Sequence, residues 1–394
     1  GDKIVAIDAF EGNNLVLVDE GHRGSSGKDW MDKRNKLCAQ GFSFEYSATF
    51  GQAVKAANDK RLEQEYAKCI LFDYSYKFFY NDGYGKDFSI LNFETDGDFT
   101  QDERNIYLTA CLLSFYQQTR FYEENRDEIR PFNIEKPLCV FVGGSVNAVR
   151  TENKRKVSDV IDVLLFLALF IKEDQEAIQR IDSLLKGNHG MLVEQRDIFA
   201  GAFDYLQSIN LSHEKLYTDL KKRLFHSAQG QLTLDYLKGS DGEIALKLGN
   251  GEAFGVINVG DASTLKKLCE EEHSDMLNVH EKEFSGSYFR NIDNAQSRIN
   301  FLIGSKRFTE GWSSWRVSTM GLMNIGKKEG SEIIQLFGRG VRLKGFNFCL
   351  KRSDEVIGVK APEYMKRLET LNIFGVRAGY MEQFNQYLED EGLK

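Results

Sequence analysis

The chain has 394 residues, a length that normally forms two or three domains with large buried cores. Hydrophobic residues make up 42% and charged residues 28%, with only 3 prolines, which excludes a disordered or linker-rich chain. The net charge of −8 at pH 7 excludes a uniformly basic nucleic-acid-binding protein, although not a local basic groove.

The cysteines and the apolar runs indicate a soluble protein of a reducing compartment. The 6 cysteines include no C-x-x-C pair, so the sequence predicts neither a disulfide framework nor a zinc ribbon. The longest apolar run, Val163–Ile171, is too short to span a bilayer. We therefore expect a cytoplasmic protein, and the abrupt start in a strand-like segment suggests a piece of a longer one.

The first predicted elements are three strands and two helices. The strands are Lys3–Phe10, Asn14–Glu20 and Phe42–Ala48, and the helices are Lys28–Cys38 and Gln52–Lys68. Within the second strand the run LVLV is unbroken, which predicts a parallel strand buried on both faces.

Polar side chains follow two of these strands. Asp19 and Glu20 end the second strand, and ligands of open α/β sheets bind at the carboxyl ends of strands. One carboxylate there can hold Mg²⁺, usually through water, and the next can orient an attacking water. Ser47 and Thr49 end the third strand, where a hydroxyl can hydrogen-bond a neighbouring carboxylate.

An aromatic segment follows at Asp73–Phe93. Tyr74, Tyr76, Phe78 and Tyr80 alternate with other residues, and the turn sequence N-D-G comes next, so the pattern predicts a β-hairpin with four rings on one face. That face either covers a core or forms a stacking or strand-separating surface for nucleic acid.

The rest of the chain predicts a second α/β domain. The remaining predicted elements are the helix Gln101–Arg130, the strand Lys136–Gly144, a helical block over about 151–228, the hairpin Gln231–Leu248, the strand Ala253–Gly260, the helix Ala262–Glu272, the strands Asn300–Gly304 and Val317–Met323, and the helices Ser331–Val341 and Tyr380–Glu391. We expect an α/β fold of two domains, 1–134 and 135–394, with the hairpin and the helical block as insertions. Unpaired histidines in the helical block are expected to be structural.

The most specific pattern is Q-x-x-G-R-x-x-R, from Gln335 to Arg342. A helix would place Gln335, Arg339 and Arg342 on one side, where two permanent cations and an amide suit the spreading charge of a triphosphate. In the preceding loop, Thr309 and Gly311 allow a hydroxyl and backbone N–H groups to approach a phosphate. Glu310 between them would contact nucleotide or pair with an arginine.

These segments resemble the motifs of superfamily 2 helicases and translocases. D-E-G-H, from Asp19 to His22, resembles motif II, S-A-T (47–49) motif III, and FTEGW (308–312) motif V; Val140–Gly144 occupies the place of motif IV, and Q-x-x-G-R-x-x-R resembles motif VI. The resemblance implies two RecA-like domains with parallel sheets, the first incomplete, with ATP and Mg²⁺ bound between them.

A longer similarity is to the Res subunit of type III restriction enzymes, over about 15–381. FGVINVGDAST, GSKRFTEGWSSWRVSTMGLMNIG and IIQLFGRGVRLKG carry it. The family implies an ATP-dependent motor that translocates on double-stranded DNA beside a methyltransferase (modification) subunit. The P-loop of the family is absent, as is any recognisable nuclease motif, so we expect the P-loop upstream and little ATP hydrolysis by this chain alone.

By this resemblance each site residue has an expected role. Asp19 and Glu20 hold the metal, and Glu20, Gln335, Arg339 and Arg342 act in hydrolysis. His22, Ser47, Thr49, Glu310 and Gly311 contact nucleotide or couple its hydrolysis to movement, and Gly143, Thr309, Tyr76 and Phe78 contact DNA. The alternatives are a non-catalytic fragment that binds DNA or a partner, and an RNA helicase of the same superfamily.

Overall fold

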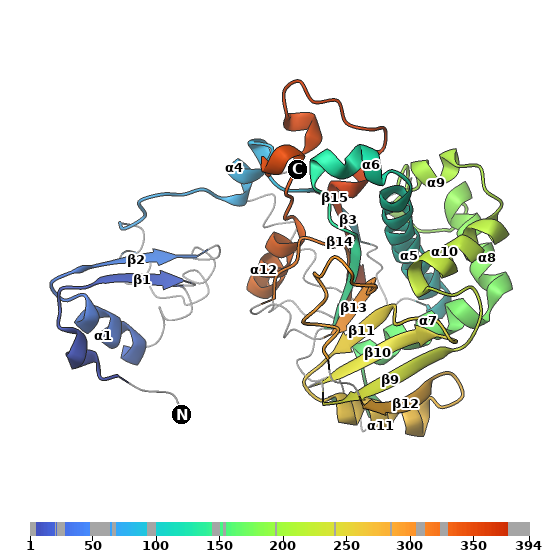
Figure 1. The fold of residues 1–394 in the computed structure, drawn as a ribbon, viewed down its shortest axis with the longest axis horizontal. Helices are drawn as coiled ribbons and strands as arrows, with labels where there is room; N and C mark the ends of the chain where they lie inside the picture. The colour runs from blue at the N-terminus through green and yellow to red at the C-terminus, as the bar shows by residue number, and fades with distance from the viewer. Residues whose placement is uncertain are drawn as a thin grey trace. The chain divides into compact units, whose positions relative to one another are not determined.

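The computed structural model describes residues 5–19, 21, 28–47, 64, 68–92, 100–143, 150–152, 155–193, 195–239, 242–283, 286–304, 312–323 and 330–376 (Figure 1). The chain divides into two compact units, Gly1–Phe78 and Phe79–Lys394. This division differs from the predicted boundary between 134 and 135, because the helix and the strand that precede that boundary fall in the second unit.

The first unit contains a two-stranded parallel sheet. Its elements are a 3₁₀ helix (Ile7–Phe10), β1 (Leu15–Asp19), α1 (Lys28–Leu37) and β2 (Phe42–Tyr46). Ile7–Phe10 was expected to be part of a strand. The expected burial of β1 on both faces is also wrong: Leu15 and Leu17 are each 64% exposed, because β1 pairs only with β2 among the described residues.

The predicted aromatic hairpin is wrong as well. Tyr76–Asn81 forms helix α4, and the next strand, β3 (Asp87–Asn92), pairs in parallel with β15 (Thr370–Val376) near the end of the described chain. In the run YKFFY, aromatic residues occur at both the period of a strand and the period of a helix, so periodicity alone does not decide between them. Tyr80 then anchors the turn, because its hydroxyl donates to Asp87 Oδ1 at 2.8 Å.

A nine-stranded sheet forms the centre of the second unit. Its order is β12-β9-β10-β11-β13-β4-β14-β15-β3, parallel throughout except where β10 pairs with β9 and with β11. The strands not yet given are β4 (Leu138–Gly143), β9 (Leu232–Lys238), β10 (Glu243–Leu248), β11 (Gly255–Asn258), β12 (Asn278–Glu283), β13 (Phe301–Gly304) and β14 (Val317–Met323). The mostly parallel, mixed sheet confirms the α/β class and the predicted 231–248 hairpin.

Helices cover both faces of this sheet (Figure 1). The helices of the second unit, some of which pack on other helices, are α5 (Gln101–Glu124), α6 (Arg126–Ile129), α7 (Asp159–Lys172), α8 (Asp174–Lys186), α9 (Asp204–Ser208), α10 (His213–Phe225), α11 (Ala262–Glu272), α12 (Gly330–Gly340) and α13 (Met365–Leu368). Successive strand residues face opposite sides. Thr319 of β14 donates to Gln118 of α5 at 3.0 Å. Met320, which follows Thr319 on the strand, faces α12 instead, since a Cβ added to Gly340 of α12 would lie 2.6 Å from the Met320 side chain. α5 and α12 therefore lie on opposite faces.

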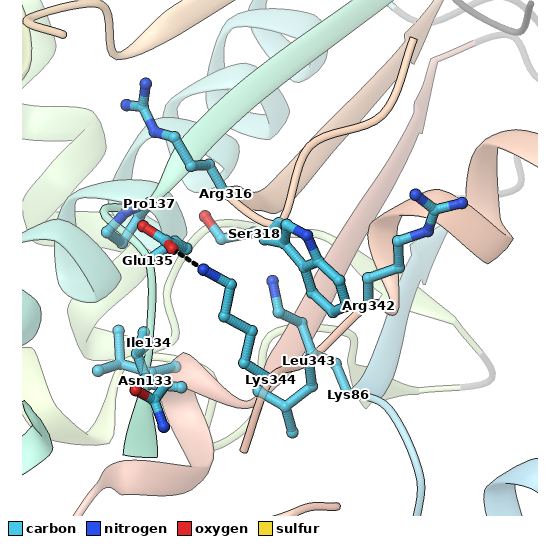
Figure 2. Close-up of a pocket in the computed structure, with 12 residues that line it drawn as sticks. Lys86, Asn133, Ile134, Glu135, Pro137, Arg316, Ser318, Arg342, Leu343 and Lys344 are labelled. Carbon is cyan, nitrogen blue, oxygen red and sulfur yellow. Dashed lines mark hydrogen bonds and ion pairs between the residues drawn. The ribbon is translucent and has the colours of Figure 1, made fainter. Parts of the chain in front are cut away.

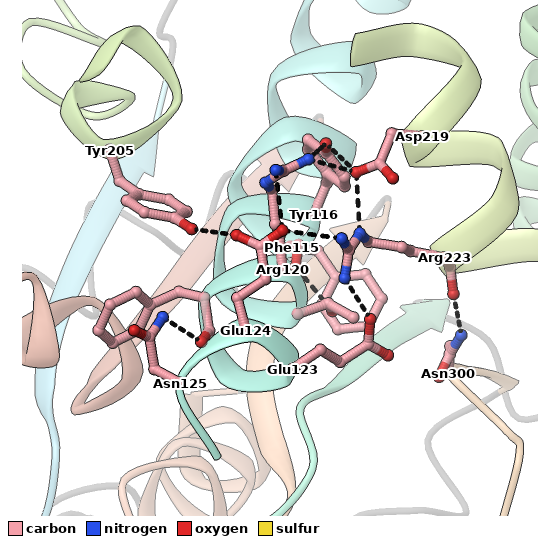
Figure 3. A network of polar contacts seen from close by, with 12 residues as sticks. Phe115, Tyr116, Arg120, Glu123, Glu124, Asn125, Tyr205, Asp219, Arg223 and Asn300 are labelled. Carbon is pink, nitrogen blue, oxygen red and sulfur yellow. Dashed lines mark hydrogen bonds and ion pairs between the residues drawn. The ribbon is translucent and has the colours of Figure 1, made fainter. Parts of the chain in front are cut away.

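α5 is buried almost all round, from Tyr107 to Phe121, since the sheet lies on one side of it and other helices on the other. A polar network fastens it to α9 and α10 (Figure 3). Asp219 accepts from Arg120 at 2.6 Å and from Arg223 at 2.8 Å, and Arg223 also reaches Glu123 at 2.7 Å. Asn300, beside β13, donates to the carbonyl oxygen of Arg223 at 3.0 Å. The network joins the helical layer to the sheet, which is a structural role.

Short elements complete the second unit: the hairpins β5 (Arg150–Glu152) with β6 (Arg155–Val157) and β7 (Leu192–Val193) with β8 (Arg196–Asp197), and the 3₁₀ helices Arg130–Phe132, Phe346–Phe348 and Ser353–Glu355. Among the described residues no helix has the length and apolar character needed to cross a membrane. The predicted helices 52–68 and 380–391 lie outside the described residues, apart from positions 64 and 68.

Candidate functional site

In the first unit, the structure brings Asp19 and Ser47 to the same edge of a sheet. Asp19 is the last residue of β1 and lies opposite Tyr46, the last residue of β2, and Ser47 follows directly. Glu20, His22 and Thr49 lie outside the described residues. Within the described part of the chain no group of three His, Cys, Asp or Glu side chains forms a metal site. The Asp19 carboxylate at a strand end is a type of ligand that Mg²⁺ accepts, since this ion keeps several waters and takes phosphate oxygens as further ligands.

In the second unit, Gln335 and Arg339 lie on the half-buried side of α12, four residues apart. Leu336, Phe337 and Gly340 face the sheet. Arg342 is not on the helix as predicted, because α12 ends at Gly340. There the chain turns away, since the carbonyl oxygen of Val341 accepts from the backbone N–H of Lys86 at 2.6 Å. The guanidinium of Arg342 donates to Ser313 Oγ in the segment before β14.

The remaining predicted site residues belong to both units or lie outside the described residues. Gly143 ends β4, where an added Cβ would lie 3.0 Å from Asp159. Tyr76 and Phe78 lie on α4 instead of a strand; Phe78 is 48% exposed, and its ring stacks on Tyr74 at 6.3 Å. Thr309, Glu310 and Gly311 lie outside the described residues.

A small cationic pocket lies beside Arg342, at the amino-terminal ends of β3, β4, β14 and β15 (Figure 2). Its lining consists of Lys86, Asn133, Ile134, Glu135, Pro137, Trp315, Arg316, Ser318, Arg342, Leu343, Lys344 and Leu368. Four of these residues are cationic and one is acidic. The pocket therefore has an excess of positive charge in a chain that is acidic overall.

Lys86 is the most unusual member of this pocket. It is only 4% exposed, its Nζ donates to the carbonyl oxygen of Val317, and no carboxylate lies within ion-pair distance among the described residues. Burial lowers the pKa of Lys86 from 10.5 to about 7, against a smaller opposing effect of Glu369. The Glu369 carboxylate is itself engaged by Ser353, whose Oγ donates at 2.7 Å. Lys86 is thus a buried cation without a partner of opposite charge in contact.

Arg316 shapes the wall of the pocket. Its guanidinium donates to three backbone carbonyls, those of Lys136 at 2.9 Å, Ile292, and Ile299 at 2.6 Å. Burial lowers the pKa of Arg316 to about 10, and burial together with Arg316 lowers the pKa of Lys136 to about 8. Carbonyls hold this guanidinium without neutralising it, so its charge adds to the positive field.

Lys344 and Glu135 form the more exposed side of the pocket. The Lys344 ammonium pairs with Glu135 and lies 5.9 Å from the centre of the Trp315 ring. Figure 2 shows the side chains of Lys86 and Lys344 directed into the same space, with Arg342 on the side of α12. Glu135 offsets one of the four cations, so the pocket suits an anion.

Comparisons with known proteins give a distant similarity. No protein-family model matches the chain. No curated protein matches it either. Among solved structures, the crystal structure of the Hef helicase domain of Pyrococcus furiosus covers 97% of this chain and 74% of its own, at 12% sequence identity and a TM-score of 0.29. The similarity is distant. It is to a helicase domain, and it establishes no specific function for this chain.

Motif reasoning located Arg342 but missed Lys86, Arg316 and Lys344. The sequence did contain a usable signal. Lys86 and Arg316 each stand directly before a strand, and Lys136 is separated from the next strand by one residue. Because the amino ends of parallel strands meet at one edge, cations at these positions converge once the strand order is known.

We expect Lys86→Met to stabilise the protein in acid. With a folded pKa near 7 and an unfolded value near 10.5, the unfolded chain binds more protons between these values. Stability from this group therefore rises with pH across that window, and the cost of the buried charge is complete below it. Methionine should raise the free energy of unfolding at pH 6 by about 1–4 kcal/mol, with a smaller gain near pH 10. Urea unfolding at both pH values measures it, and destabilisation at pH 6 would contradict the assignment.

Proposed function

We propose that this chain is part of the motor of an ATP-dependent DNA translocase similar to the Res subunit of type III restriction enzymes. The observation that carries the proposal is the position of the Q-x-x-G-R-x-x-R pattern. Gln335 and Arg339 lie on one side of α12, against a mostly parallel sheet, and Arg342 follows beside a cationic pocket. Two arginines near one another on a rigid element suit the charge that spreads over a transferring phosphoryl group.

In this proposal each of the predicted site residues has a defined role. Asp19 holds Mg²⁺, which neutralises phosphate charge when bound, and Glu20 orients the attacking water. Ser47, which directly follows the strand paired with that of Asp19, would link that site to the rest of the first unit. Arg339 and Arg342 stabilise the charge of the γ-phosphate, and Thr309 and Gly143 contact the DNA backbone. A modification subunit is the proposed partner.

DNA-stimulated ATP hydrolysis tests the proposal in the natural, full-length protein. We expect double-stranded DNA to stimulate phosphate release and Asp19→Asn to lower it by at least about a hundredfold, since the metal supplies several kcal/mol to the transition state. The matched control is Asp29→Asn on α1, an exposed residue that pairs with Lys33 at 2.6 Å.

The outcomes separate the alternatives. Turnover that DNA does not stimulate and RNA does would identify an RNA helicase. Binding of DNA without any turnover would identify a non-catalytic module. Full turnover by Asp19→Asn would contradict the assigned metal ligand.

A further inference from the structure

We propose that the pocket at the amino-terminal ends of β3, β4, β14 and β15 binds a tetrahedral oxyanion, a phosphate group, through Lys86 and Lys344 with Arg342 beside them. Lys86 and Lys344 belong to none of the helicase-like motifs, so the inference goes beyond the proposed ATPase. Arg342 is the residue that the two proposals share.

The charge of Lys86 has no carboxylate in contact among the described residues, which favours binding of an anion. A buried cation without a carboxylate in contact costs stability, and replacing such a group by an apolar one is often stabilising. Lys86 is 4% exposed, and the one hydrogen bond of its ammonium among the described residues is to the backbone carbonyl of Val317. Two of the three ammonium hydrogens therefore remain available to a ligand. A bound anion would supply the missing opposite charge.

More positive than negative side chains lie around Lys86. Arg316 before β14 and Arg342 and Lys344 after α12 are positive; Glu135 before β4 and Glu369 before β15 are negative. Both carboxylates already have partners, Lys344 and Ser353. The Glu135 side chain is 39% exposed, so it can turn to water and release Lys344 to an incoming anion. Phosphate groups are bound by such clusters of lysine and arginine.

The pocket also has a built-in dependence on pH. The pKa of Lys86 lies near 7 without a ligand, and an anion in contact favours its charged form. Affinity should therefore fall as pH rises through 7. Lys136, whose pKa lies near 8, does not line the pocket and is the matched control for charge loss nearby.

Calorimetric titration with sulfate tests the inference, because sulfate keeps its charge across the range in which Lys86 titrates. We expect the parent protein to bind sulfate at pH 6 and to bind it more weakly at pH 8.5. Lys86→Met should lose about tenfold in affinity at pH 6. The affinity that remains in Lys86→Met should not show the parent's decrease between pH 6 and pH 8.5. Lys344→Met should weaken binding independently, and Lys136→Met should bind like the parent at pH 6. Equal affinity in the parent and Lys86→Met, or no binding in the parent, would overturn the proposal.

Competition then identifies the source of the phosphate. Displacement of sulfate by a non-hydrolysable ATP analogue assigns the pocket to nucleotide, and displacement by a short DNA duplex assigns it to the nucleic-acid backbone. Displacement by neither leaves a site for free inorganic oxyanions. Sulfate binding does not depend on turnover, so loss of the ATPase proposal and loss of this one are distinguishable.

Discussion

Replacing Arg342 with alanine in the natural protein should lower ATP turnover by about 10³–10⁵-fold, while ATP and DNA still bind. In the proposed motor, Mg²⁺ near Asp19 would hold the phosphates of the ground-state nucleotide. Arg342 instead meets charge that develops during phosphoryl transfer. An interaction made chiefly in the transition state affects turnover more than binding.

The surroundings of Arg342 favour such a role over that of a surface cation. Its guanidinium contacts a serine hydroxyl, not a carboxylate, among the described residues. An exposed ion pair would contribute under about 1 kcal/mol and would leave turnover unchanged when removed. Arg342→Lys should not restore the rate, because an ammonium lacks the planar fork of the guanidinium.

Turnover rate and nucleotide dissociation constant, measured together, decide the matter. Exposed Arg290 supplies the control, and Arg290→Ala should leave both values at those of the parent. Turnover of Arg342→Ala within about threefold of the parent would exclude the arginine-finger role. A melting temperature equal to that of the parent shows that the variant is folded.

The local sequence pattern was sufficient to predict those strands whose side chains are buried in the core. The apolar run at 138–143 predicted one central strand, 317–323 was also predicted as a strand, and alternation across a glycine turn predicted the hairpin of β9 and β10. It failed for 76–81, where aromatic residues suit a strand and a helix equally. A strand was correctly expected after the N-D-G turn, but the partner of this strand, β3, was not predicted, since β15 is almost the whole length of the unit away in sequence.

The cationic pocket shows the same limit at the level of a site. Lys86, Arg316 and Lys344 come from segments far apart in the chain, and only the strand order places them together. Motifs report residues that are close in sequence, so they identified Gln335, Arg339 and Arg342 and none of the pocket lysines. By contrast, Asp19 and Ser47 were expected at adjacent strand ends, and β1 and β2 are adjacent and parallel.

Arg316→Ala should lower the free energy of unfolding by about 3–5 kcal/mol. The guanidinium joins three segments, since it donates to the carbonyl oxygens of Lys136 before β4, and of Ile292 and Ile299 before β13. Alanine leaves these acceptors without donors in a buried place and opens a cavity where a side chain 4% exposed had been. Arg316→Lys keeps the charge but not the three-directional fork, so most of the loss should remain.

Urea unfolding measures this effect, with Arg298→Ala as the matched control. Arg298 lies in the segment before β13 that contains the acceptors Ile292 and Ile299, but its side chain is 64% exposed and pairs with Glu252, which is 66% exposed, at 2.7 Å. Removing that pair should cost under about 1 kcal/mol. If Arg316→Ala lowers the free energy of unfolding no more than Arg298→Ala does, the backbone hydrogen bonds between strands hold the amino-terminal edge of the sheet without the Arg316 guanidinium. A large loss in Arg316→Ala alone would establish that one buried arginine fixes the edge on which the pocket is built.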